Sequence, residues 1–424
     1  MKSSGWVVAA GVAVVVGAAG LSVAGPVVSD VRLVPRAASR TVDIYYKLTG
    51  EQAYITVAIE TNALTAPAWQ GVKIPDARVT RLSGDVARLT AADAVNDKHI
   101  VWNAGEDWPD VEIGEARARV TAWAAGYPPP YLVFDLGGDY QGGDYFTQHT
   151  ITALGYPSAE ALPHGGLTND IYRSCLLVLR RIEAGAFMMG APVGELGRYN
   201  NEDLHRVTLS HSFYIAVFEF TKGQWRRIKF AGPTPIPYNP ADSESYENLR
   251  GGTWPAEDDA IPPSTLIGTL RSRCSPAFEF DLPTEAQWEY ACRAGTQTAL
   301  HNGMDLTSVT EPCPNRAAIA WDFWTSGSAH HRVGEKLPNA WGLYDMIGNV
   351  YEATRDRLTD HLGAAGVVDP AGALTGTVYV AKGGAYNGKI DPRAAFRGAY
   401  SSSWVNGLRL AIRPLEGTPA PEPQ

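Results

Sequence analysis

The pattern of side chains changes once along the chain, near Cys175, and this change constrains the fold most. Residues 27–124 form short runs of alternating apolar and polar side chains, such as TVDIYYKL and AYITVAIET, separated by turn residues. That pattern is typical of strands in an antiparallel β-sandwich. After Cys175 the chain combines a few helix signals with long segments rich in glycine, proline and aromatic residues. We therefore predict an immunoglobulin-like all-β sandwich over residues 27–124 and a loop-rich α+β domain over residues 170–415.

Two helices of the second domain begin with the same capping signal. Thr221 and Thr284 are each followed three residues later by a glutamine, which is the Thr-x-x-Gln form of a capping box. Gly295 predicts the end of the second helix. Trp288 and Cys292 lie four residues apart and would share one buried face of that helix. We therefore predict that the Cys292 thiol is packed or bridged rather than reactive.

Composition and charge argue against one class of partner. They also predict a linker and a C-terminal tail. The apolar content of 45% and the charged content of 19% are ordinary for globular proteins. A net charge of −9, with no run of Lys or Arg, argues against a nucleic-acid partner, because phosphate binding needs a basic surface. Residues 125–169 contain three consecutive prolines and paired glycines, which predicts a linker. Residues 416–424 form a proline-rich tail.

The N-terminus resembles an export signal. One lysine precedes an apolar run from Trp6 to Ala24, and small residues follow. We predict a secretory signal peptide over residues 1–25, and hence a periplasmic, cell-surface or secreted protein. The alternative is an uncleaved N-terminal anchor, because the run approaches the length of a membrane span. No later stretch of the sequence is apolar enough to span a bilayer.

Export would permit disulfide bonds between the four cysteines. They allow three pairings that the sequence does not distinguish, and unpaired buried thiols are the alternative. No Cys-x-x-Cys pair is present, which argues against a zinc knuckle. The four are Cys175, Cys274, Cys292 and Cys313.

Four motifs between Leu176 and Pro414 together resemble the formylglycine-generating enzyme, or sulfatase-modifying factor, superfamily. They are RIEAGAFMMGAPVGELGRYNNEDLHRVTLSHSFYIAVFEFTKGQW, FDLPTEAQWEYACRAGT, LPNAWGLYDMIGNVYEATRD and KGGAYN…GLRLA. The signal peptide and the β-sandwich make the chain similar to a bacterial exported subfamily. The resemblance implies a modified C-type-lectin-like α+β domain, which agrees with the loop-rich pattern.

The resemblance also implies where copper would bind. Oxidase-type members convert a sulfatase cysteine to formylglycine, using oxygen and a copper ion held by two thiolates, which are suitable ligands for Cu(I). Here the corresponding interval, NGKIDPRAAFRGAYSSSWVN, holds no cysteine, and residues 394–397 read Ala-Ala-Phe-Arg where Cys-x-x-Arg is expected. We therefore expect no copper and no formylglycine formation. The alternative is an oxidase, or another enzyme, with altered active-site residues.

The motif DMIGNVYE matches a segment that wraps calcium in the family. Carried over by position, the ligands would be the side chain of Asp345, the carbonyls of Gly348 and Val350, and the carboxylate of Glu352. Hard oxygen donors on a glycine-bent loop suit Ca²⁺. The alternative is a loop with two solvated carboxylates.

The C-terminal segment retains the region where the family places its substrate groove. Tyr and Trp supply contact area at low entropic cost, and Ser and Asn supply adaptable hydrogen bonds, as in antibody paratopes. We predict a non-catalytic binding surface for a protein or glycan, exposed on one rim of the domain. The alternative is that these side chains pack as a plug against the core. The residues are Tyr386, Asn387, Arg397, Tyr400, Ser402, Trp404 and Asn406.

A few other polar residues are weaker candidates. Lone histidines in polar loops are mostly solvated, so His205, His211, His330 and His331 are not predicted as metal ligands. Glu219 lies within an apolar run. We predict that it is a buried carboxylate satisfied by hydrogen bonds rather than a catalytic base.

Overall fold

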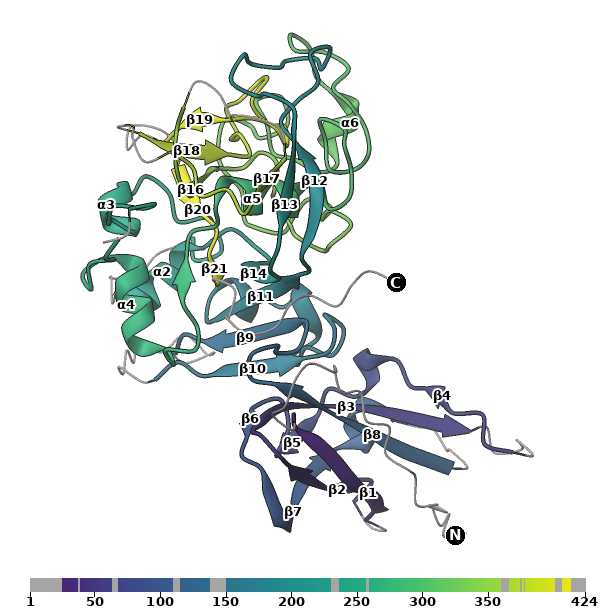
Figure 1. Ribbon diagram of the computed structural model, residues 1–424. Coiled ribbons are helices and arrows are strands. Elements are labelled where there is room, and N and C mark those ends of the chain that lie inside the picture. The colour runs from purple at the N-terminus through teal and green to yellow at the C-terminus, as the bar shows by residue number, and fades with distance from the viewer. Residues whose placement is uncertain are drawn as a thin grey trace. The chain divides into compact units, whose positions relative to one another are not determined.

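A computed structural model describes residues 25–36, 39–62, 68–109, 115–137, 150–229, 236–256, 259–359, 366–373, 376, 378–400 and 406–412. The chain divides into two compact units. Unit 1 comprises Met1–Phe134, Ala153–Asn169 and Pro423–Gln424, and unit 2 comprises Asp135–Thr152 and Asp170–Glu422 (Figure 1). The predicted signal peptide, apart from its last residue, and the proline-rich tail lie outside the described residues. In the part described, no helix is long and apolar enough to cross a membrane.

Unit 1 consists of two antiparallel sheets around one apolar core. The first sheet has the order β1, β2, β7, β5, and in the second β3 pairs with β4, β6 and β8. The predicted β-rich first domain is therefore confirmed. The strands are β1 (Val27–Pro35), β2 (Val42–Thr49), β3 (Ala53–Asn62), β4 (Val72–Lys73), β5 (Leu82–Gly84), β6 (Leu89–Thr90), β7 (Asp93–Trp102) and β8 (Glu115–Ala124), with short helical turns at η1 (Asp76–Arg78) and α1 (Ala104–Asp107).

Alternation along the strands explains why unit 1 folds in this way. In β2, Ile44, Tyr46 and Leu48 are fully buried, whereas the intervening Tyr45 and Lys47 are partly exposed. Successive side chains of a strand point to opposite faces, so one face of β2 is apolar throughout. That face packs in the core that both sheets share.

The segment predicted as a linker contains regular structure. Within residues 125–169, β9 (Tyr131–Asp135) pairs antiparallel with β10 (Ala153–Tyr156), and η2 (Gly166–Thr168) follows. Leu132 and Phe134 are fully buried. The linker prediction is wrong for these strands, because the short apolar run YLVF buries its side chains despite the flanking prolines and glycines.

Unit 2 is an α+β domain, as predicted. Strands β11, β14, β21 and β15 lie next to one another in that order; a second sheet has the order β12, β13, β17, and a third β19, β18, β16, β20. The strands are β11 (Leu176–Ile182), β12 (Gly185–Met189), β13 (His205–Leu209), β14 (Phe213–Ala216), β15 (Phe280–Asp281), β16 (Tyr351–Arg357), β17 (Val367–Val368), β18 (Tyr379–Lys382), β19 (Gly398–Ala399), β20 (Asn406–Leu408) and β21 (Ala411–Ile412). The helices are η3 (Asp170–Arg173), α2 (Lys222–Lys229), α3 (Tyr246–Leu249), α4 (Leu266–Arg273), α5 (Glu285–Arg293) and α6 (Pro314–Ala317).

Both capping boxes form where the sequence predicts them. At α5, the Gln287 backbone N–H donates to the Thr284 hydroxyl (3.1 Å), and the Thr284 N–H donates to the Gln287 side chain (2.9 Å). Thr221 and Gln224 make the same reciprocal pair before α2. Past the last residue of α5, Gly295 has φ +93°, which only glycine adopts readily.

The four cysteines are all buried and unpaired. Of the two alternatives left open by the sequence, the structure therefore has free thiols and no disulfide. Cys292 lies on the buried face of α5 beside the fully buried Trp288, which confirms that it is a packed thiol.

Candidate functional site

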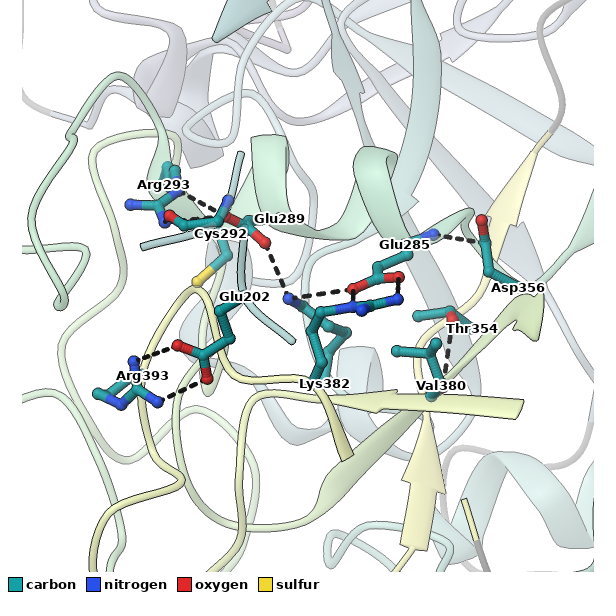
Figure 2. A network of polar contacts seen from close by, with 12 residues as sticks. Glu202, Glu285, Glu289, Cys292, Arg293, Thr354, Asp356, Val380, Lys382 and Arg393 are labelled. Atoms are coloured by element: carbon teal, nitrogen blue, oxygen red, sulfur yellow. Dashed lines mark hydrogen bonds and ion pairs between the residues drawn. The ribbon is translucent and has the colours of Figure 1, made fainter. Parts of the chain in front are cut away.

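The interval in which the family's cysteines fall is occupied by a buried ion cluster. The Arg393 guanidinium donates to both carboxylate oxygens of Glu202, at 2.7 and 3.0 Å, and to Glu195 at 2.7 Å. Arg393 and Glu202 are fully buried and face each other in Figure 2. This segment is thus held by charge pairing.

A glycine allows the two segments of this cluster to meet. Both glutamates lie on the loop between β12 and β13, and Gly197 sits between them with φ +83°. A Cβ at Gly197 would lie 2.8 Å from the Ile390 side chain and 3.3 Å from Arg393 Nε. The loop can therefore approach residues 390–393 only because residue 197 lacks a side chain.

The cluster pairs two glutamates with one guanidinium. Burial raises the pKa of Glu195 even though Arg393 opposes this shift. For Arg393, burial lowers the pKa, but the hydrogen bonds with Glu202 outweigh burial and raise it. The arginine is therefore charged, while burial disfavours the charged form of Glu195.

Asp391, two residues away, is clamped by two tyrosines. Tyr199 donates its hydroxyl to Asp391 Oδ1 (3.0 Å), and Tyr351 donates to Oδ2 (2.7 Å). The centre of the Phe396 ring lies 5.9 Å from that of Tyr199 and 5.7 Å from that of Tyr351. Burial, followed by the negative charge of Asp391, raises the pKa of Tyr199 to about 12 and that of Tyr351 further. Both phenols are therefore protonated donors at neutral pH.

Beside this clamp the molecule exposes apolar side chains. On the same loop as Tyr199, Val193 is 90% exposed, and Leu196 and Tyr199 are each 41% exposed. Isolated exposed apolar residues are common, and of these three only Tyr199 contacts Asp391. The loop therefore exposes an aromatic ring whose hydroxyl holds a carboxylate in place, and it provides no nucleophile.

A second buried set of ion pairs joins α5 to β18. Lys382, from β18, lies between Glu289 at 2.9 Å and Glu285 at 3.7 Å (Figure 2). Burial raises the pKa of Glu289, but Lys382 and Arg293 outweigh burial and bring it to about 2. Asp356 accepts the Glu285 N–H at 2.6 Å, and its own pKa is raised to about 7, first by burial and then by the charge of Glu285.

Comparison with known proteins identifies the family. Residues 178–414 match the sulfatase-modifying factor enzyme 1-like domain, which is more than half of the chain. The chain belongs to this family. The formylglycine-generating enzyme of Mus musculus is 35% identical over 261 residues, a match that covers 52% of this chain and 69% of that protein. The enzyme of the same name from Thermomonospora curvata is 34% identical over 121 residues, covering 25% of this chain and 38% of that protein.

Solved structures include similar chains. Treponema denticola variable protein 1 superimposes with a TM-score of 0.43 and 24% sequence identity, covering 57% of this chain and 96% of that one. The predicted superfamily and the α+β fold class are confirmed by the family match.

Within the sulfatase-modifying factor domain, much of the predicted binding surface is buried. The Arg397 guanidinium makes two hydrogen bonds to Glu285, at 2.5 and 3.0 Å. Tyr400 is 6% exposed and donates its hydroxyl to the Glu244 carbonyl (2.8 Å), and Asn406 is buried in β20. The prediction of exposure is wrong for these three. Arg397 and Tyr400 have polar partners inside the domain, and Asn406 belongs to a buried strand that pairs with β16.

The other predicted surface residues differ from one another. Tyr386 is half-buried and Asn387 is exposed. Ser402 and Trp404 lie outside the described residues. Among the members of this set that the structure describes, Asn387 alone is exposed as predicted, and its binding role stays a prediction.

The predicted calcium ligands make other contacts. Glu352 accepts hydrogen bonds from the Arg409 guanidinium, at 2.6 and 2.9 Å, and from the Trp288 indole N–H at 2.6 Å. Asp345 accepts the Gly334 N–H at 2.6 Å. A cation at this place would compete with the Arg409 charge, so the donor set as arranged does not fit Ca²⁺. Among the residues described, no group of three or more His, Cys, Asp or Glu side chains could hold a metal ion. Calcium binding stays a prediction that these contacts do not favour.

Glu219 has the environment expected of it. It is fully buried and accepts the Asn349 side-chain N–H (2.6 Å) and the Val350 backbone N–H (3.2 Å). Burial, followed by the charges of Asp345 and Glu352, raises its pKa well above the ordinary value. It is a buried carboxylate satisfied by hydrogen bonds.

A second polar cluster, near Tyr386, could not be identified from the sequence. His330 Nε2 lies 3.2 Å from Asp242, and its Nδ1 lies 3.0 Å from the Asn239 side-chain nitrogen. Lys222 contacts the other Asp242 oxygen at 2.9 Å. Burial raises the pKa of Asp242, but the hydrogen bonds from His330 and Lys222 outweigh it and bring it to about 2. These groups satisfy one another, so the cluster is structural.

Sequence reasoning missed most residues of the Arg393 site. Arg393 and Asp391 lie in the C-terminal interval, where the absent cysteines and the Tyr, Ser and Trp content carry the predictions and the charged residues 391 and 393 carry none. Their partners Glu202 and Tyr199 lie 191 and 192 residues earlier in the chain. A charged residue in a segment that otherwise buries its side chains would have been the available signal.

Proposed function

We propose that the sulfatase-modifying factor domain of this chain is a ligand-binding module that forms no formylglycine. One observation carries the proposal: Arg393, paired with Glu195 and Glu202, occupies the interval where copper-binding thiolates are expected. A guanidinium and two carboxylates do not fit Cu(I), which prefers thiolates. The ligand would contact the loop that carries Tyr199 and the neighbouring segment 387–391.

Two of the cysteines elsewhere in the chain support the same proposal. Burial raises the pKa of Cys274 to about 12 and raises that of Cys292 further. For Cys313, burial raises the pKa, but hydrogen bonds from Thr307 outweigh it, so the value is lowered. Burial thus disfavours the thiolate, the form that binds metal, at Cys274 and Cys292.

The test is a copper and oxygen assay on the purified full chain. We expect no stoichiometric Cu(I) binding and no oxygen consumption with a cysteine-containing sulfatase peptide. The mouse formylglycine-generating enzyme, run in parallel, is the positive control. Turnover of the peptide by this chain would refute the proposal and favour an oxidase with altered residues.

We also propose that the chain is exported. The apolar run between Trp6 and Ala24 supports this. N-terminal sequencing of the protein recovered outside the cytoplasm tests it: a mature end near residue 25 is expected, and an intact Met1 in a membrane fraction would favour the anchor.

A further inference from the structure

Unit 1 contains a cavity of about 160 Å³ between β3, β5 and the segment 154–163. Ile55 and Val79 are buried and line its inner part. Ser83 and Arg88 also line it and are exposed. The cavity therefore extends from the core of the β-sandwich to solvent.

Main-chain hydrogen bonds fix the walls of this cavity. The Ala87 N–H donates to the Ile55 carbonyl at 2.8 Å, and the Gly155 N–H donates to the Ala87 carbonyl at 2.5 Å. Ala87 has φ +61°, in the left-handed region that favours glycine. Farther along the segment, the Ser158 hydroxyl donates to Asp76 at 2.8 Å. The hollow is thus preformed by the backbone, which lowers the ordering cost of binding a ligand.

The size of the cavity limits the ligand. Protein interiors hold few voids larger than a water molecule, and an apolar cavity of about 150 Å³ is large enough to bind benzene. The inner lining is mostly aliphatic, so an apolar body is favoured there. Further aliphatic lining residues are Val57, Leu82 and Val86.

The charge at the cavity favours an anionic ligand. Arg88 is the only charged residue among those that line it. Within the part of the chain that the structure describes, the Arg88 side chain makes no hydrogen bond or ion pair. Two nearby carboxylates are engaged elsewhere: Asp76 lies 2.7 Å from Lys73, and Asp107 accepts the Thr80 hydroxyl at 2.7 Å. A guanidinium binds a carboxylate through two parallel hydrogen bonds, so Arg88 suits a ligand of this charge.

We propose that this cavity of unit 1 binds a free small monocarboxylate whose apolar body is about the size of a benzene ring, such as benzoate. The apolar body fills the hollow beside Ile55 and Val79. The carboxylate pairs with the Arg88 guanidinium at the exposed end and accepts the Ser83 hydroxyl. This site belongs to the β-sandwich and is separate from the binding function proposed for the sulfatase-modifying factor domain.

The first experiment compares ligands by titration calorimetry on the full chain. We expect benzoate to bind at least about tenfold more tightly than benzyl alcohol or benzylammonium, because these two lose the charged hydrogen bond with Arg88. Affinity should rise from acetate to benzoate as more apolar surface is buried, and it should fall for 1-pyrenecarboxylate, which is too large for the cavity. No saturable binding of benzoate, or equal or tighter binding of benzyl alcohol or 1-pyrenecarboxylate, would overturn the inference.

The second experiment uses a matched pair of variants. Arg88→Gln removes the positive charge, so benzoate should bind at least about tenfold more weakly. Arg78→Gln makes the same change at another exposed arginine of unit 1 that does not line the cavity, and it should leave binding unaltered. Equal losses in the two variants would mean general attraction of anions and would contradict the proposed site.

A third variant tests the hollow itself. Ala161 is buried and lines the cavity, so Ala161→Phe places a ring where the ligand would lie and should abolish benzoate binding. Unchanged binding in a folded Ala161→Phe protein would place benzoate elsewhere and refute the assignment. If Ala161→Phe does not fold, the ligand series and the two arginine variants, which alter exposed side chains, still decide.

Discussion

The interiors of the two units differ in composition: that of unit 1 is apolar, and that of unit 2 also contains buried ion pairs. In unit 1, fully buried Ile44, Ile55 and Ile100 pack between two sheets, and the backbone groups of each sheet pair between its own strands. In unit 2, Lys382, Arg393 and Arg409 are also fully buried, and each contacts at least one glutamate.

The difference follows from the amount of regular structure. Strands satisfy their backbone groups within the sheet and can therefore bury purely apolar faces. The long loops of unit 2 run between short elements, and buried side-chain ions hold them: Arg393 attaches residues 390–393 to the β12–β13 loop, and Arg409 holds β16. A buried ion pair specifies position more strongly than it adds stability.

The largest effect should come from breaking one buried pair. Arg409→Met leaves Glu352 buried without its counter-charge, so we expect unit 2 to lose about 3–5 kcal/mol of unfolding free energy. In unit 1, Arg32→Met removes a solvent-exposed partner of Asp97 and should cost about 1 kcal/mol or less. Urea unfolding of both variants measures the contrast. Equal losses would show that the two units do not differ in this way.

A double variant sharpens the same comparison. Arg409→Met combined with Glu352→Leu removes both charges, and we expect it to recover much of the stability lost in Arg409→Met, because no unpaired charge stays buried. A double variant as unstable as the single one would mean that the hydrogen bonds of Glu352, including that from Trp288, matter more than its charge.

The stability of unit 2 should fall as pH rises from about 4 to about 7, whereas that of unit 1 should fall as pH drops below about 4. The pKa of Asp356 is raised to about 7 and that of Asp345 to about 6, mainly by burial, so the folded state holds protons that the unfolded state releases near pH 4. Stability from these groups is present below about pH 4 and is lost as pH rises to about 7. In unit 1, the hydrogen bond from Arg36 lowers the pKa of Asp43, so its contribution is lost as pH falls below about 4.

Thermal melts between pH 4 and pH 8 test this sign. We expect the unfolding free energy of unit 2 to fall by on the order of a few kcal/mol across this range, so that its melting temperature falls too. The melting temperature of unit 1 should stay constant or rise. Asp356→Asn should flatten the slope of unit 2, because it removes one of the titrating groups. A slope unchanged in Asp356→Asn would mean that Asp356 titrates normally.

The smallest expected effect concerns calcium. Since Arg409 already neutralises Glu352, we expect the melting temperature of unit 2 to be the same with calcium and with chelator. Asp345→Ala serves as the comparison, and its melting temperature should be equally insensitive to calcium. A rise with calcium in the parent chain, absent from Asp345→Ala, would restore the predicted site despite the ion pair.

Local patterns made much of the fold predictable. The capping boxes at Thr221 and Thr284 involve residues three positions apart, and the alternation in β2 involves neighbours two positions apart. Such interactions are present in the chain before any tertiary contact forms, so residue type and spacing suffice to predict them. The short apolar run of β9 lacked such a signal, and the linker prediction failed there.

By itself, then, the sequence determined the order of the two units, the starts of α2 and α5, the family, and the lack of a cysteine after Cys313. Only the tertiary structure decided that Tyr400 is buried and that Arg393 meets Glu202 across 191 residues of chain. The physical reason is the range of the interactions. Caps and strand periodicity act between neighbours, whereas the partner of a buried charge depends on which distant loops the fold brings together.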